Sequence, residues 1–169
     1  MGSQAEDIFK KIRDIPYQIP LKTKEPDYCC SGKHIALKKS LEKLGYQVRY
    51  RVCSFRWSDL HLPEKLTGIP HENNSTHVYL EVYIDNKWKI VDATWDKGLS
   101  SFFQINEWDG KTDTRIAIPV LGSFSAKKSN EVMLSENEKT VEADLKTNGS
   151  FYRELNKFLK SIRDSSASN

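Results

Sequence analysis

An alternating segment with a turn at its centre constrains the fold of this chain more than any other feature. Residues 76–95 read THVYLEVYIDNKWKIVDATW, and apolar side chains alternate with other side chains on the way into the central Asp-Asn pair. Such alternation indicates a strand with one buried face, and a short polar pair between two such runs favours a two-residue hairpin turn. With that turn Ile84 pairs with Lys87, and we expect the return strand over 87–94.

Periodic patterns on both sides of the hairpin predict further elements. The clearest is a helix over 31–44, in which Leu37, Leu41 and Leu44 form one apolar stripe. Its charged residues lie mostly on other faces, and Gly45 supplies the conformation that ends many helices. Prolines force extended backbone in the arm before it. The other predicted elements are a helix over 5–12, the arm over 14–27, a strand over 46–55, a long loop over 56–75, a strand over 114–120 and a helix over 151–163.

This order of elements points to an α+β fold, with an N-terminal helix packed on a largely antiparallel sheet. The chain has 169 residues, of which 38% are hydrophobic, which is enough for one domain with a sizeable core. We therefore expect a single domain over 1–163, followed by a disordered tail over 164–169.

Composition excludes several kinds of partner. The 26 Lys and Arg against 23 Asp and Glu give a net charge of +3, and the basic residues are scattered, so we expect no nucleic-acid partner. No run of about 18 apolar residues and no apolar signal-peptide core is present, so we expect no membrane span and a cytoplasmic location. The odd number of 3 Cys argues against a disulfide framework and fits a reducing compartment.

Two polar residues of the hairpin fall on the same face of the sheet. The predicted register places Tyr79 opposite Asp92, so His77 and Asp92 become diagonal neighbours within reach of a side-chain contact. A carboxylate that holds one ring nitrogen orients the imidazole and leaves the other nitrogen free to act as a base. Such a base needs a nucleophile.

A thiol is available at the start of the helix over 31–44, where PDYCCSGKH contains Cys29 and Cys30. Unpaired backbone N–H groups and the positive end of the helix dipole favour a thiolate there, and the same N–H groups can hold a developing oxyanion. Cys30 shares a face with the apolar stripe, whereas Cys29 lies further out. Cys30 is therefore the preferred nucleophile, although the sequence leaves open which of the two cysteines faces His77.

Three spaced segments resemble the transglutaminase-like superfamily, a papain-related α+β group. In that group a Cys opens a helix, a His begins the next strand as H-x-[aromatic]-x-E-V, and an Asp closes the return strand after W-x-x-[Val/Ile]. Here the matching segments are CCSGKHIALKKSLEKLGYQVRYRV, THVYLEVYID and NKWKIVDATWD, roughly residues 28–95. The resemblance implies a papain-like core, with Cys30 as nucleophile, His77 as general base and acid, and Asp92 as the residue that orients His77.

The resemblance also implies a function: cysteine-dependent acyl transfer, or hydrolysis of an amide or peptide bond, in a peptide or protein amide substrate. It implies no cofactor and no metal. Superfamily members include transglutaminases, cysteine proteases and deglycosylating amidases, and the sequence does not select among them. Two alternatives stay open. One is a non-catalytic domain that keeps the fold and binds a peptide or protein in its cleft, and the other is acetyl transfer to arylamines.

Several further residues are candidates for the site. The second oxyanion donor stays unassigned between Tyr17, Gln18 and some other group. The loop over 56–75 is long enough to act as a lid. At least one of three tryptophans is expected to line the cleft, namely Trp57, Trp95 or Trp108.

A metal site is the weaker interpretation of the same residues. Cys30 and His34 are four positions apart and could combine with Cys29 and His77. Zinc sites usually contain a second Cys or His pair at short spacing, and this chain has no convincing one. We therefore expect His34 to be a packed residue of the first helical turn.

Overall fold

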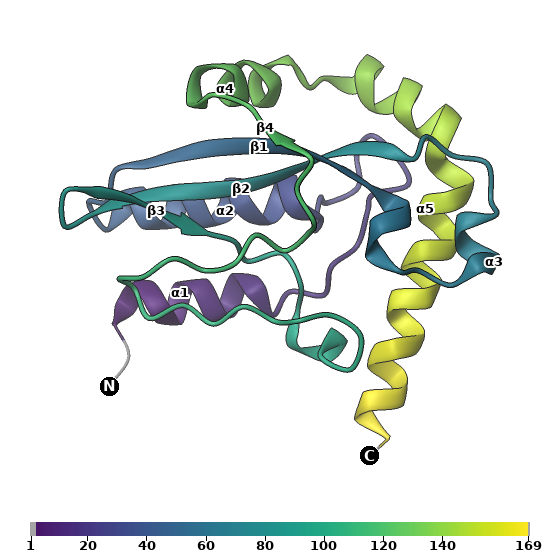
Figure 1. The fold of residues 1–169 in the computed structure, drawn as a ribbon, viewed down its shortest axis with the longest axis horizontal. Coiled ribbons are helices and arrows are strands. Elements are labelled where there is room, and N and C mark those ends of the chain that lie inside the picture. Colours follow the sequence, from purple (N-terminus) through teal and green to yellow (C-terminus); the bar gives the residue numbers. More distant parts are fainter. Residues whose placement is uncertain (1–2, 169) are drawn as a thin grey trace.

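A four-stranded antiparallel sheet forms the centre of the computed structural model, which describes residues 3–168 (Figure 1). Its strands are β1 (Val48–Arg56), β2 (Asn74–Ile84), β3 (Lys87–Val91) and β4 (Gly122–Ser123). They lie in the order β3, β2, β1 and β4, and every neighbouring pair is antiparallel. Helices flank the sheet on several sides. The α+β class and the antiparallel sheet predicted from the sequence are therefore confirmed.

The hairpin of β2 and β3 has the predicted register. Ile84 pairs with Lys87, and the same register continues to Val91. The turn residues Asp85 and Asn86 have φ angles of 48° and 62°. Both central positions of a type I′ turn require this left-handed conformation, which Asn and Asp adopt more readily than most residues.

The return strand ends at Val91 and not at Thr94, so its predicted end is wrong by three residues. The reason is a local turn formed by Asp92. Its Oδ1 accepts hydrogen bonds from the Thr94 backbone N–H at 3.0 Å and from the Thr94 hydroxyl at 2.6 Å. Its own N–H donates to the Thr114 hydroxyl at 2.9 Å instead of to β2. These bonds replace the ladder of the sheet.

Two helices pack together beside β2, namely α1 (Gln4–Arg13) and α2 (Cys30–Lys43). Leu37 and Leu41 of the predicted stripe are fully buried, whereas Leu44 is half-buried at the C-cap. Gly45 follows with a φ of 91°, the left-handed conformation expected of a glycine that ends a helix. The buried residues of this core are Ala5, Phe9, Ile12, Leu37, Leu41, Leu80, Val82, Val91, Ala93 and Trp108.

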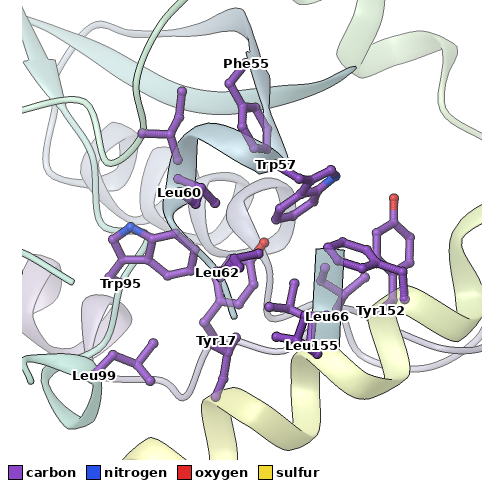
Figure 2. Close-up of a cluster of buried hydrophobic side chains, with 14 of the residues drawn as sticks. Tyr17, Phe55, Trp57, Leu60, Leu62, Leu66, Trp95, Leu99, Tyr152 and Leu155 are labelled. Atoms are coloured by element: carbon purple, nitrogen blue, oxygen red, sulfur yellow. The ribbon is translucent and has the colours of Figure 1, made fainter. Parts of the chain in front are cut away.

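A second core lies against the C-terminal helix α5 (Glu138–Ala167), as Figure 2 shows. Its other walls come from the 3₁₀ helix η1 (Trp57–Leu60), the single-turn helix α3 (Glu64–Thr67) and the arm before α2. Aromatic rings dominate it. Trp57 meets Phe151 at a centroid distance of 5.2 Å, and Tyr17 meets Trp95 at 4.8 Å. The segment predicted as a long loop over 56–75 thus contains two short helices, and its buried residues Trp57, Leu60, Leu62 and Leu66 belong to this core.

The C-terminal third differs from the sequence prediction. Residues 114–120 form no strand, because their polar groups pair singly with scattered partners, as in the bond from Trp95 Nε1 to the Ala117 carbonyl at 2.9 Å. A helix that was not predicted, α4 (Ala126–Ser135), packs on β1. Helix α5 begins at Glu138, well before 151, and continues through 164–167 of the predicted tail. Asn169 lies outside the described residues.

Within residues 3–168, no helix combines the length and the apolar character needed to cross a bilayer.

Lys33 connects α2 to the arm before it and to the chain after β3. Its ammonium is buried and donates to three backbone carbonyls, those of Arg13 at 2.7 Å, Ile15 at 2.9 Å and Thr94 at 2.7 Å. Burial lowers the pKa of Lys33 to about 8, and the carboxylates of Asp96 and Asp92 act in the opposite direction. The ammonium of Lys33 therefore joins three parts of the chain, namely α2, residues 13–15 and Thr94, which are not paired in a sheet.

Replacing Lys33 by Met is expected to lower the free energy of unfolding by roughly 1–3 kcal/mol, because buried carbonyls lose their donor. Lys39→Met is a matched control, since Lys39 lies exposed on the same helix. Urea unfolding of both variants measures the difference. Equal midpoints for the two variants would show that the buried ammonium does not hold these segments.

Candidate active site

Cys30 is the first residue of α2, and Cys29 is its N-cap. Both side chains are half-buried, both are free thiols, and both line the same cleft. The Cys29 backbone N–H donates to Asp27 Oδ1 at 2.8 Å. The Asp27 carboxylate thus satisfies one of the N–H groups that precede the helix, and it fixes the start of α2 next to the cleft.

Gly32 permits this close approach of the arm. A Cβ at this position would lie 1.9 Å from the Asp27 carbonyl oxygen and 2.7 Å from the Asp27 Cγ. Real Cβ atoms do not come so close to a backbone oxygen, so any larger residue would displace the Asp27 segment. The glycine in the motif CCSGKH is required by packing and not by an unusual φ angle.

His77 lies in β2 and is almost completely buried. Its Nε2 donates to Asp92 Oδ2 at 2.7 Å, which leaves Nδ1 for a second partner. Cys30 and His77 line the same cleft, and each favours the charged form of the other. The structure therefore brings together the three residues singled out from the sequence, Cys30, His77 and Asp92. Of the two cysteines, Cys30 is the one whose charge interacts with that of His77.

Asp92 is held by four hydrogen bonds. Besides the two from Thr94 to Oδ1, Oδ2 accepts from His77 and from the Ala117 backbone N–H at 2.8 Å. Burial alone would raise the pKa of Asp92, but the positive charge and hydrogen bond of His77 keep it well below its ordinary value. The side chain is therefore an ionised, immobile acceptor.

His34 connects the helix of the thiol to the segment of the carboxylate. Its Nδ1 lies 2.7 Å from the Cys30 carbonyl oxygen, and its Nε2 accepts from the Ala93 backbone N–H at 2.9 Å. These partners fix the neutral tautomer with the proton on Nδ1. Burial lowers the pKa of His34, while the nearby Asp92 opposes the shift. The sequence suggested only packing for this residue, and its role in positioning two site segments was missed.

The two hydrogen bonds of His34 also prevent it from acting as a metal ligand. With both ring nitrogens used by backbone groups, His34 has no lone pair for a metal ion. Among residues 3–168, no three or more His, Cys, Asp and Glu side chains are grouped so that they could hold a metal ion.

The surroundings of Cys30 and His77 shift the pKa values of both groups. Burial alone would lower the pKa of His77, but the charge and hydrogen bond of Asp92, together with Cys30, raise it to about 10. A hydrogen bond from Cys29 and the interactions with His77 and the Val78 N–H lower the pKa of Cys30 well below its ordinary value, against the effect of burial. The bond to Cys30, together with burial, raises the pKa of Cys29. Both shifts favour a Cys30 thiolate beside a His77 imidazolium.

A cleft of about 350 Å³ opens over this pair. Trp57 and Trp95 line it, as expected of at least one tryptophan. Trp108 lies elsewhere, packed on Phe9 with a centroid distance of 5.8 Å. The predicted lid loop contributes Trp57, Leu60 and Ser75, and the first two are buried core residues.

One wall of the cleft was not foreseen, because it comes from α4 and α5. The residues are Val132, Ser135, Glu136, Thr140, Val141, Asp144, Leu145 and Tyr152. A signal for this wall is present in the sequence. Asn137 and Thr140 form a capping box, and the helical spacing of Val141, Leu145 and Tyr152 continues from it.

The two candidates for a second oxyanion donor differ in position. Gln18 is exposed and belongs to an isolated bridge with Tyr28. Tyr17 is buried, its ring packs on Trp95, and it lines the cleft. Of the two, only Tyr17 is placed to face a substrate.

Comparison of the chain with models of protein families, with curated proteins and with solved structures finds no match. The site is therefore interpreted from its own geometry.

Replacing Asp92 by Asn is expected to lower the free energy of unfolding at pH 7 by about 3–5 kcal/mol, because a buried ion pair loses one partner. A raised pKa of His77 stabilises the fold at low pH, and this contribution is lost as the pH rises through about 10. The difference between wild type and variant should therefore shrink above that pH.

Urea unfolding between pH 7 and pH 11 measures this difference. Asp164→Asn is the control, because its exposed pair with Lys160 contributes little. A deficit of the Asp92 variant that stays constant through about pH 10 would contradict the ion pair.

Proposed function

We propose that this protein is a transglutaminase-like cysteine enzyme that transfers an acyl group from an amide, in a peptide or protein, to water or to an amine. The observation that carries the proposal is a cleft lined by both Cys30 and His77, in which the His77 ring is hydrogen-bonded to Asp92. A thiol at the start of α2, a His on β2 and an Asp directly after β3 also resemble the order Cys, His and Asp in the papain-related superfamily.

The first half of the reaction follows from the charges of the pair. The Cys30 thiolate attacks the carbonyl carbon of the amide, and a C–S bond forms as the carbonyl oxygen becomes an oxyanion. The backbone N–H of Cys30 is directed out of the N-terminus of α2 and is a donor for this oxyanion. His77 then gives its Nδ1 proton to the nitrogen of the leaving amine. The C–N bond breaks, and a thioester on Cys30 remains.

The second half returns the site to its starting state. Neutral His77 takes a proton from water or from an incoming amine, whose oxygen or nitrogen attacks the thioester carbonyl. The C–S bond breaks, and the thiolate forms again beside the imidazolium. Asp92 keeps its charge throughout, since four donors hold it and its role is to orient His77.

Trapping of the thioester tests this function directly. The chain is incubated with peptide amides, quenched in acid, digested with trypsin and analysed by mass spectrometry. Cleavage after Lys24 and Lys33 gives a peptide of residues 25–33 that contains both cysteines. An acyl mass on Cys30, absent in Cys30→Ser and strongly reduced in His77→Ala, which lacks the proton donor for the leaving amine, is the expected result. Binding of peptides without any acylation would instead support a non-catalytic domain.

The pH dependence of alkylation tests the ion pair. Iodoacetamide modification of Cys30 should fall off at a lower pH than that of a free thiol, because the pKa of Cys30 is lowered. Cys29→Ser retains a hydrogen-bond donor and should keep this profile, whereas Cys30→Ser should lose the fast reaction. A rate that falls about tenfold per pH unit below pH 8.5, as for a free thiol, would remove the basis of the mechanism.

A further inference from the structure

The charged groups that line the cleft are of one sign. Three carboxylates, Asp27, Glu136 and Asp144, take part in the lining, and no Lys or Arg does. The chain as a whole carries a net charge of +3, so this lining does not follow from composition. Apart from the His77 imidazolium, which is already paired with Asp92 and Cys30, the cleft therefore presents negative charge to a ligand.

These carboxylates have no cationic partner within the described part of the chain. Asp144 accepts hydrogen bonds from the neutral groups of Asn148 at 2.7 Å and Tyr152 at 3.1 Å. Asp27 accepts from the backbone of Cys29. Between residues 3 and 168, none of the three carboxylates forms an ion pair. Burial, followed by the charges of Asp27, Cys30 and Asp144, raises the pKa of Glu136. Carboxyl groups thus gather in the lining of the cleft beside Cys30 without a cationic partner.

A second observation points to a ligand at this place. Tyr17 is only 5% exposed, and it lines the cleft. Its hydroxyl makes no hydrogen bond with any residue in 3–168 and yet is not sealed from solvent, so it is open to a bound molecule. Its ring and those of Trp57, Trp95 and Tyr152 give the cleft aromatic walls. Aromatic faces attract cations, and they also accept the apolar stem that carries one.

Resting on the function proposed above, we propose that the acyl donor carries a protonated amine or a guanidinium on an apolar stem, which the cleft binds between its aromatic walls and the carboxylates of Glu136 and Asp144. The charge belongs on the donor because the donor enters while Cys30 is a free thiolate. A cation that arrives with the donor compensates negative charge that the free site holds. The Tyr17 hydroxyl donates to a polar group of the same donor.

Equilibrium binding to Cys30→Ser tests the proposal without requiring any reaction. The probes are Nα-acetyl-lysinamide, the norleucine analogue without the charge, and the glutamic acid analogue with the opposite charge, each titrated by NMR. The lysine probe should bind about tenfold more tightly than the norleucine probe at low salt, as expected for one cation near uncompensated carboxylates. The glutamic acid probe should bind most weakly, although the net charge of the chain would favour it.

Two substitutions test whether the preference for the lysine probe over the norleucine probe arises in the cleft. Glu136→Gln has no hydrogen bond to lose, and we expect it to reduce the preference to about threefold or less. Glu142→Gln is the matched control, because this exposed residue of α5 lies outside the lining, and it should leave the preference unchanged. Raising the ionic strength from about 0.01 M to about 1 M should also reduce the preference, since the screening length falls from about 30 Å to about 3 Å.

The donor that carries the cation is either a peptide or a small amide, and a longer probe distinguishes the two. A lysine-containing tetrapeptide amide that binds more tightly than the single residue assigns the donor to a peptide, and equal affinities assign it to a small amide. Equal binding of the lysine and norleucine probes, or a preference that survives in Glu136→Gln, would overturn the proposal. That outcome is distinct from failure of the proposed function, which appears as absence of the acyl mass on Cys30 in the wild-type chain.

Discussion

The buried carboxylate of Asp92 is the interaction on which the rest of this structure depends. It lies where the hairpin leaves the sheet, and four donors from three segments of the chain converge on it. An unpaired charge at this depth would cost several kcal/mol, so those segments are held together by the need to satisfy it. The same carboxylate fixes which nitrogen of His77 faces the thiol. Stability and the geometry of the site therefore have one common origin.

The N-terminal turn of α2 meets this carboxylate through two polar residues that point inward. Lys33 donates to the Thr94 carbonyl, and His34 accepts from the Ala93 N–H. Both bonds end on the residues that directly follow Asp92. The first turn of the helix is thus tied to the residues beside the carboxylate, and the thiol is placed with it. Because each bond joins segments far apart in the sequence, loss of one is expected to move the thiol relative to His77.

Local patterns were sufficient for the parts of the fold set by neighbouring residues. The hairpin register followed from a two-residue turn, and Gly45 ended the helix where predicted. The register alone placed His77 and Asp92 on one face, and the structure has their side chains in contact. A thiol at the start of a helix was likewise readable, because the helix start follows from local periodicity and proline positions.

The parts that sequence reasoning missed depend on tertiary contacts. Lys33 shares a helix face with the apolar stripe, and only the three carbonyls that surround its ammonium explain how a charged residue is buried there. Residues 114–120 have the composition of a strand but pair with side chains, because Asp92 and Trp95 bind their polar groups. Helices α4 and α5 form a wall of the cleft, and no pattern within them shows which side of the sheet they cover.

The electrostatics of the cleft set two effects against each other. Carboxylates around a thiol disfavour its ionised form, whereas the His77 imidazolium and the dipole of α2 favour it. The pKa of Cys30 is lowered although burial opposes the shift, so the favourable groups dominate in the free site. In the reaction proposed above, attack on a carbonyl would move the charge from sulfur to oxygen, away from the imidazolium. The surrounding carboxylates would then weigh more heavily, and a positive group on the substrate would act on the transition state as well as on binding.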